Sequence, residues 1–275
     1  MERMAKMLSV SKSGYYAWIS RPLSRRKQER RYLDVLVKAA FEANQRRYGS
    51  RKISRELLAK GSPYSRSRVA DSMRRQGLRS KVRRKFVVTT DTKHDFMASP
   101  NLLNRDFETD RPNKVWVSDI TYLSSRAGWL FLVVFIDLFS RRVVGWCVST
   151  SLGHETVLTA LDRAVWQRRP DPGLMIHSDR GIQYCCQGFR KAIHTHQFAQ
   201  SMSRKANCWD NAVAESFFRT LKTEWLYHLD LIDLDHAQRE LFAYIEMFYN
   251  NQRLHAYLDY MSHAIFERLT LQKVA

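Results

Sequence analysis

The chain has 275 residues, 44% of them apolar, and four cysteines with no C-x-x-C pair, which favours one or two domains with real cores over a disulfide- or zinc-stapled fold. Its longest apolar run, residues 129–138, is too short to span a membrane. Residues 1–8 carry charges at Glu2, Arg3 and Lys6 and lack the apolar core of a secretory signal peptide, so we expect a protein of the reducing cytoplasm. The net charge of +19 lies almost entirely in residues 1–100, which hold 26 Lys and Arg against 8 Asp and Glu, and such a block indicates a binder of phosphate backbones.

The basic first third has the spacing of helices. Residues 31–44 place apolar side chains three and four positions apart, a stripe of Leu33, Leu36, Val37, Ala40 and Phe41. A second helix is expected from Ser50 or Arg51 to Gly61, and a third over residues 67–76 with Ser65 as its N-cap. Residues 9–18 look like a fragment of another such unit.

Helix, short turn and basic helix are the outline of a helix-turn-helix, so we interpret residues 1–85 as a DNA-binding region. The side chains expected to contact DNA there are Arg51, Lys52, Arg66, Arg68, Arg74 and Arg75. A plain helical bundle, a solvated basic face and an RNA binder remain as alternatives. Residues 86–112, which are polar and have little periodicity around Pro100, are expected to be a linker after the basic cluster 81–85.

From Val115 onward, the pattern of apolar residues indicates alternating strands and helices, an α/β arrangement. Strands are expected at residues 115–123, 129–138, 143–148, 174–177 and 198–202. Helices are expected at residues 155–168, at 188–196 and from Asp210 onward. Three antiparallel strands followed by helix–strand–helix–strand–helix is the order of a ribonuclease-H-like fold, a mixed five-stranded sheet with flanking helices, which we assign to residues 113–230. Residues 231–275 are expected to hold an amphipathic helix, 236–249, and a less regular tail.

Three carboxylates stand out in this region. Asp119 shares the apolar face of its strand with Val117 and Thr121, where a charge is costly unless it is paired or bound to metal. Asp179 lies where a strand gives way to a loop. Glu215 lies on a helix whose polar stripe is Asn211, Glu215, Arg219 and Lys222, opposite an apolar stripe of Ala214, Phe217, Leu221 and Trp225. Each acid taken alone is more often structural than catalytic.

Together the acids resemble a known signature. Asp179 and Glu215 are separated by 35 residues, and Lys222 follows Glu215 by two helical turns, as in retroviral-type integrases and insertion-sequence transposases. The amino-acid sequence around the acids resembles OrfB-type transposases, encoded by the second reading frame of such elements, even more closely, at residues 116–122, 177–184 and 210–218. Residues 47–53 and 249–255 resemble that group too. The chain departs from the pattern at Ala206, where glycine is expected, and at His263, where proline is usual.

The resemblance implies a metal-dependent DNA transposase. Asp119, Asp179 and Glu215 would be both its catalytic and its metal-binding residues and would hold two Mg²⁺ or Mn²⁺ ions. Lys222 and Arg219 would contact DNA beside them. The partners implied are the element ends, the target DNA, further copies of the chain, and an upstream-frame protein fused by frameshifting, and the setting is the nucleoid of a bacterial cytoplasm.

Two rival functions stay open at this point, as do the roles of several residues. One rival is a non-enzymatic DNA-binding regulator of transposition, and the other is a ribonuclease-H-type nuclease. Asp137 is interpreted as a structural or supporting acid near Asp119. His177 and His255 could contact DNA, orient an acid or be structural. Trp209 and Trp225 could stack on bases, but we expect them to pack in the core.

Overall fold

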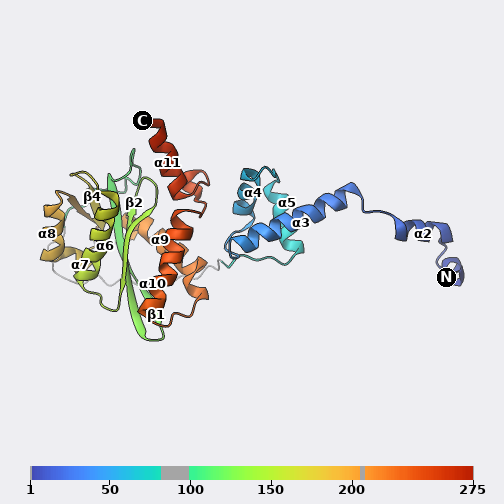
Figure 1. The fold of residues 1–275 in the computed structure, drawn as a ribbon, viewed down its shortest axis with the longest axis horizontal. Helices are drawn as coiled ribbons and strands as arrows, with labels where there is room; N and C mark the ends of the chain where they lie inside the picture. Colours follow the sequence, from blue (N-terminus) through green and yellow to red (C-terminus); the bar gives the residue numbers. More distant parts are fainter. Residues whose placement is uncertain (1, 82–98, 205–207, 275) are drawn as a thin grey trace. The chain divides into compact units, whose positions relative to one another are not determined.

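The computed structural model describes residues 2–81, 99–204 and 208–274, and the chain divides into two compact units after Lys81 (Figure 1). The basic cluster after Lys81 and the first part of the expected linker lie outside the described residues. Residues 99–111 form no helix or strand. No helix in the described ranges is long and apolar enough to cross a membrane.

The first unit is helical. Its helices in the described residues are α1 (Glu2–Met7), α2 (Lys12–Ser20), α3 (Arg25–Ala43), α4 (Ser50–Ala59) and α5 (Arg66–Arg75). Ser24 and Ser65 cap α3 and α5, each accepting a hydrogen bond from a backbone N–H three residues on. The predicted apolar stripe of α3 is confirmed, since Leu33, Val37 and Phe41 are buried in a core shared with α4 and α5.

The second unit is built on a five-stranded sheet of order β3-β2-β1-β4-β5. The strands are β1 (Val115–Ser125), β2 (Gly128–Asp137), β3 (Val143–Ser149), β4 (Met175–Ser178) and β5 (Ala199–Met202). Strands β1, β2 and β3 are antiparallel neighbours, whereas β4 and β5 run parallel to β1. This mixed five-stranded sheet with flanking helices confirms the fold class expected from the sequence.

Helices cover both faces of the sheet (Figure 1). One layer comprises α6 (His154–Arg168), α7 (Ile182–Cys185) and α8 (Gln187–Thr195), which enclose a core around Trp116, Phe135 and Leu161. The other contains α9 (Ala212–Glu224), entered through the short 3-10 helix η1 (Cys208–Asn211), and α10 (Leu234–Phe242). Short α7 was not predicted.

The C-terminal segment is more regular than expected. The predicted helix 236–249 is present as α10 followed by a π-helix, η3 (Ala243–Asn250). A further helix, α11 (His263–Val274), occupies the tail that was expected to be less regular. Its Glu267 is buried against the β2–β3 turn and α6 through hydrogen bonds with Ser140 and Arg168, so this segment packs as part of the second unit.

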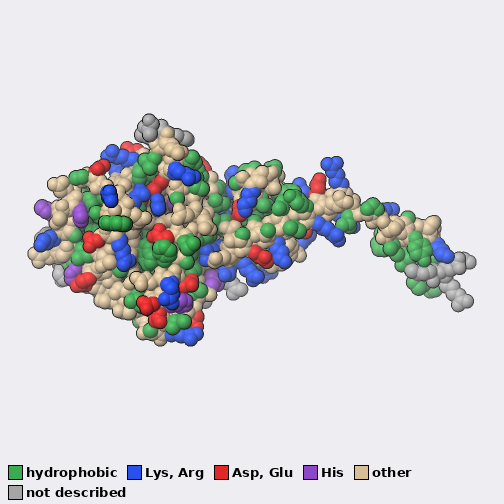
Figure 2. All heavy atoms as spheres, viewed as in Figure 1, with side chains coloured by type: hydrophobic (Ala, Val, Ile, Leu, Met, Phe, Trp, Pro, Cys, Tyr) green, Lys and Arg blue, Asp and Glu red, His purple; other side chains and the backbone are tan. Residues whose placement is uncertain are grey.

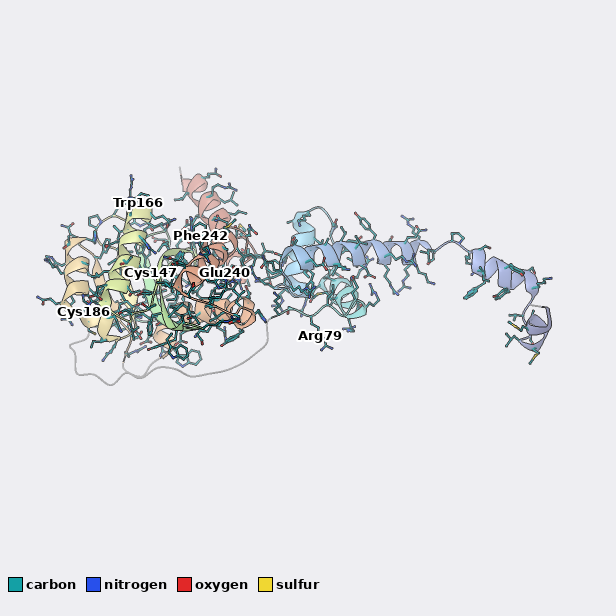
Figure 3. The ribbon with its side chains drawn as sticks, turned by 60° about the horizontal axis from the view of Figure 1, so that its bottom comes forward. Arg79, Cys147, Trp166, Cys186, Glu240 and Phe242 are labelled. Atoms are coloured by element: carbon teal, nitrogen blue, oxygen red, sulfur yellow. The ribbon has the colours of Figure 1, made fainter. Side chains whose placement is uncertain are left out.

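Cys147, Cys185 and Cys186 are free thiols, as the sequence suggested. Cys147 lies in β3 and Cys186 at the junction of α7 and α8, at separate places in Figure 3, and Cys185 is buried beside Met202. Burial raises the pKa of the Cys147 and Cys185 thiols, so neither is an activated nucleophile.

Candidate active site

The register of β1 and β4 places two of the predicted acids side by side. Ser118 in β1 pairs with Ser178, the last residue of β4, and the two strands run parallel. The next residue in each chain segment is an aspartate, Asp119 and Asp179. Both therefore lie at the same level of the sheet, at the carboxyl end of β4, where ligand sites gather in α/β folds.

A glycine shapes the loop that follows Asp179. The Asp179 Oδ1 accepts a hydrogen bond of 3.0 Å from the backbone N–H of Gly181. A Cβ atom on Gly181 would lie 3.0 Å from that same oxygen and 3.1 Å from Oε1 of Gln183. A residue larger than glycine would therefore crowd the Asp179 carboxylate, which would have to shift by a few tenths of an ångström to make room.

The third acid, Glu215, lies in the first turn of α9 and is exposed. The helix buries the apolar stripe predicted for it, including Ala214, Phe217 and Leu221, and packs on β1. The start of a helix carries partial positive charge, which favours an ionised carboxylate there. The apolar stripe predicted for this helix is thus confirmed, whereas Asn211, which was placed on the polar stripe, is buried.

The three acids and two basic side chains act on one another electrostatically. Burial raises the pKa of Asp119 well above its usual range, and the negative charges of Asp179 and Glu215 add to the rise, whereas Lys222 opposes it. Although the Glu215 side chain reaches solvent, partial desolvation by its neighbours raises its pKa, and the nearby charge of Arg219 opposes the rise. The pKa of Lys222 is lowered by burial and raised by Asp119. Such a cluster of desolvated like charges is stabilised by a cation.

The chemistry of these side chains suits a divalent metal ion. In the described part of the chain, no three His, Cys, Asp or Glu side chains converge closely enough to enclose an ion. The three acids nevertheless offer only carboxylate oxygens, the ligands that Mg²⁺ prefers. Burial and repulsion from Asp179 both raise the pKa of Asp119, and a bound cation would offset both effects, so the donor set fits.

A fourth acid, Asp210, organises the loop that enters α9. It is fully buried and accepts hydrogen bonds from Arg204 Nε at 2.9 Å, Arg105 Nε at 2.8 Å and Asn101 Nδ2 at 2.9 Å. The side chain of Arg204 is the main cause of the lowered pKa of Asp210. In the sequence Asp210 stands out only as part of a motif, because two of its partners, Asn101 and Arg105, are distant in the chain.

Trp209, next to Asp210, corrects an expectation. It was predicted to pack in the core, but its side chain is 69% exposed, because the 3-10 turn before α9 presents it to solvent. Trp225, at the end of α9, is buried as expected and lies against Tyr244.

The two candidate histidines lie within the protein. His177 is fully buried between two serines, with Nδ1 at 2.9 Å from Ser201 Oγ and Nε2 at 3.2 Å from Ser203 Oγ. Burial lowers the pKa of His177 to about 4, so the ring is neutral at physiological pH. His255 lies in the C-terminal segment, its ring 5.1 Å from that of His263.

Asp137, the competing acid, ends β2 and is fully buried. Its carboxylate accepts hydrogen bonds from the backbone N–H groups of Asn113 and Phe139, at 2.7 and 2.8 Å, and lies 3.6 Å from a guanidinium nitrogen of Arg168. Burial raises the pKa of Asp137 to about 6. Its contacts are those of a residue that closes the β2–β3 turn.

Several arginines of the first unit are already paired with acids. Arg75 donates to Asp34 of α3 at 2.6 Å, and Arg74 donates to Asp71 at 2.8 Å. Asp34 also accepts from Ser72, so it joins α5 to α3. These contacts give Arg75 a role in packing that its charge alone did not reveal.

The other basic candidates of this unit lie at its surface. Arg66 and Arg51 are exposed at the starts of α5 and α4. Arg68 is exposed too, with its guanidinium 3.7 Å from Glu29, and Lys52 lies over the ring of Tyr48. Figure 2 shows Lys and Arg side chains over the surface of these helices.

The tail motif of residues 249–255 connects the C-terminal segment to β3 and to the end of α9. Asn250 exchanges two 3.0 Å hydrogen bonds with the backbone of Val143 in β3. Arg253 forms a buried bidentate ion pair with Glu224, at the last residue of α9, with both distances 2.8 Å. Of the two departures from the resembled pattern, Ala206 lies outside the described residues, and His263 is the first residue of α11.

Comparison with protein families agrees with this architecture. Residues 27–86 match an HTH-like domain, and residues 109–208 and 196–262 match two models of the integrase core domain. Among solved structures, the chain is similar to one in the simian T-cell lymphotropic virus intasome bound to PP2A regulatory subunit B56 gamma. That match has 16% identity and a TM-score of 0.49, over 78% of this chain and 70% of the other.

Close relatives occur among insertion-sequence proteins. Transposase InsF for insertion sequence IS3A of Escherichia coli is 40% identical, over 98% of this chain and 95% of its own length. The insertion element IS600 uncharacterized 31 kDa protein of Shigella sonnei is 39% identical, over 99% of this chain and 100% of its own. On this identity over nearly its whole length, the chain belongs to the family of insertion-sequence transposases with an integrase-like core.

Proposed function

We propose that this DNA transposase cuts and joins DNA strands at a site where Asp119, Asp179 and Glu215 bind two Mg²⁺ or Mn²⁺ ions. One observation carries the proposal. The parallel pairing of Ser118 with Ser178 sets Asp119 beside Asp179, and the pKa of Asp119 responds to both other acids. Their placement on two strand segments and a helix gives one site contributed by three elements.

The reaction is two in-line displacements at phosphorus. Water first attacks a phosphodiester at the element end, so that a P–O bond forms and the bond to the 3′ oxygen breaks, leaving a 3′-hydroxyl. That hydroxyl then attacks a target phosphodiester and releases another 3′-hydroxyl. Bound divalent ions would supply activation of the attacking oxygen and stabilisation of the leaving oxygen. No serine or tyrosine nucleophile is needed.

The chain's own residues would hold the substrate and set the charge. Lys222 and Arg219 would bind backbone phosphates of the strand being cut. Lys222 interacts electrostatically with Asp119, and Arg219 with Glu215. The helical unit, with exposed Arg66 and Arg51, would bind element DNA. Asp119 would have to be ionised to bind a cation, and its raised pKa means that ion binding would release a proton near the site.

The proposed assembly follows the family resemblance. Two element ends must be handled together with a target, so we expect copies of the chain to oligomerise on DNA. An upstream-frame protein of the same element, joined to this chain by frameshifting, would add end recognition. The setting would be the bacterial nucleoid, where the DNA substrate lies.

The acids are tested with purified protein, labelled element-end DNA and Mg²⁺. The variants Asp119→Asn, Asp179→Asn and Glu215→Gln should each lose strand cleavage and strand transfer by at least about 100-fold, because each removes a charge that holds the ions. Asp162→Asn, a change at an exposed acid of α6, is the matched control and should keep full activity. Undiminished activity in any of the three variants would remove that residue from the site.

The same assay separates the two rival functions. A regulator would bind element ends without cutting them, and a ribonuclease-H-type nuclease would cut RNA–DNA hybrids without transferring strands. The wild-type chain is assayed alone and fused to its upstream frame, so that a missing partner is not mistaken for missing chemistry. Strong activity in excess chelator would contradict the metal-dependent scheme.

A further inference from the structure

The start of α9 is tied directly to the strand that carries Asp119. Asn211, the residue before α9, donates a hydrogen bond of 3.1 Å from Nδ2 to the backbone carbonyl of Ser118. Ser118 immediately precedes Asp119, and Glu215 follows Asn211 by about one helical turn. One amide side chain therefore bridges the chain segments that present two of the three acids.

Ser118 is held from its other side as well. Its hydroxyl lies 2.8 Å from the hydroxyl of Tyr184, which is fully buried in α7, the short helix after Asp179. Its backbone pairs with Ser178 in β4. These contacts hold the Ser118 carbonyl in place. The hydrogen bond from Asn211 therefore positions the start of α9 relative to the strands.

Only the nitrogen end of the Asn211 amide is hydrogen-bonded within the described residues. The residue is only 4% exposed, and its Oδ1 has no hydrogen-bond partner among the described residues. Burying an unpaired amide oxygen costs about 1–3 kcal/mol. An apolar side chain of similar size would avoid that cost, so folding stability alone does not account for asparagine at this place.

We propose that Asn211 is a positioning residue that sets the distance of Glu215 from Asp119. The inference rests on the proposed function, since it concerns the same site. Two carboxylates that share ions must be spaced to the ions' coordination geometry, and Mg²⁺ accepts little departure from an octahedron. Displacements of about 1 Å at such a site lower rates about 100-fold.

The test compares Asn211→Leu with wild type. Leucine has a similar volume, removes the donor that contacts Ser118 and also removes the unpaired oxygen. We expect the thermal midpoint to stay within a few degrees of wild type or to rise, while Mn²⁺ affinity without DNA, read from the electron paramagnetic resonance signal of free Mn²⁺, falls about tenfold. Strand transfer should fall more with Mg²⁺ than with Mn²⁺.

Two further variants guard the interpretation. Asn211→Ser keeps a small polar residue that can cap α9 but is too short to reach Ser118, so it should reproduce the loss of ion affinity even if leucine disturbs folding. Asn101→Leu removes an amide contact to Asp210 in the same loop without touching β1. It should keep wild-type ion affinity, because the link from Asn211 to Ser118 is intact.

The possible outcomes distinguish failure of the positioning role of Asn211 from failure of the proposed function. If wild type binds Mn²⁺, Asp119→Asn does not, and both Asn211 variants bind like wild type, the positioning role is overturned and the proposed function stands. A loss of affinity in Asn101→Leu equal to that in Asn211→Leu also overturns it, since the effect then belongs to the loop in general. If wild type binds no ion, both proposals fall.

Discussion

His263 shows how one side chain makes stability depend on pH. It is fully buried at the start of α11, its Nδ1–H donates to the Ser140 carbonyl at 2.7 Å, and its ring stacks on Tyr249 with centroids 4.4 Å apart. Burial lowers the pKa of His263 to about 3. The folded protein therefore holds the neutral ring, whereas the unfolded chain protonates it near its ordinary value of 6.5.

The sign of the pH effect follows from these two values. Between pH 6.5 and pH 3 the unfolded chain binds the extra proton, so the free energy of unfolding decreases as the pH falls and is unaffected by this group above about pH 7. We expect His263 to account for a loss of about 2 kcal/mol between pH 7 and pH 5. Urea unfolding at each pH measures it.

His263→Pro is the informative comparison. Proline is well tolerated at the first residue of a helix, and it has no proton to bind. Its free energy of unfolding should be lower than wild type at pH 7, because the hydrogen bond and stacking are lost, but should fall less steeply toward pH 5. Parallel curves for the two proteins would show that His263 does not titrate as described.

At the scale of single residues, the sequence pattern singled out three acids, whose catalytic role stays a prediction, but not the buried contacts near them. Asp119, Asp179 and Glu215 stand in recognisable patterns, and the structure places them in one electrostatic cluster. Asp210 and Asn211 act through partners about a hundred residues away in the chain, Arg105 and Ser118. Such contacts leave no periodic pattern, so local reasoning could not find them.

At the scale of elements, Gly145 sets how closely α6 packs on β3. A Cβ atom there would lie 2.5 Å from the Ala160 carbonyl oxygen and 2.5 Å from the Ala164 Cβ. Because the obstacles include backbone of α6, the helix must move as a whole. Gly145→Ala should lower the free energy of unfolding by about 3 kcal/mol or more, measured by urea denaturation.

A second glycine serves as the control for this change. Gly49 has nothing within 4 Å of its Cβ position and has an ordinary negative φ. Gly49→Ala should therefore change stability by less than about 1 kcal/mol. Equal losses in both variants would mean that close packing of α6 is not what Gly145 provides.

The ion pair between Arg253 and Glu224 joins the C-terminal segment to the end of α9. Both side chains are buried, and Tyr244 donates to the same carboxylate at 3.3 Å. Arg253→Met leaves a buried carboxylate without its main partner and should lower the free energy of unfolding by about 3–5 kcal/mol. The double variant with Glu224→Leu should recover most of that loss, and a loss as large as in the single variant would argue against the pair.

Element prediction failed where packing is polar. The buried side chains of α11 include His263 and Glu267, spaced four residues apart, and Glu267 bonds to Ser140 and Arg168. Because this helix docks through polar groups, it has no apolar stripe for periodicity to detect. Helix α7 was missed for a different reason, since four residues are too few to show a period.

At the scale of the whole molecule, most of the basic excess lies in the first unit, and in the proposed function this unit binds element DNA while the nearly neutral remainder carries the chemistry. The logarithm of the DNA-binding constant should fall linearly with the logarithm of salt concentration, with a slope set by the number of phosphates contacted. Arg66→Ala should reduce that slope by about 0.9, because it removes one phosphate contact. Asp119→Asn should leave the slope unchanged, and an unchanged slope in Arg66→Ala would place that side chain away from the backbone.

The order of elements was the part of the fold most open to prediction. Alternating residues in β1 and the apolar run of β2 identified the strands, and their sequence identified the class of sheet. The exposure of Trp209 was predicted wrongly, because an aromatic residue beside a helix start usually packs. How a 3-10 turn presents one side chain depends on three-dimensional placement that composition does not encode.

Asn250 has a consequence for the behaviour of the protein in solution. β3 is an edge strand, and edge strands can recruit a strand from another molecule through their unpaired backbone groups. The amide of Asn250 occupies both the N–H and the carbonyl of Val143, as a neighbouring strand would. The last residue of the π-helix η3 thus occupies both backbone pairing groups of Val143, so a strand from another molecule cannot pair with this edge at the start of β3.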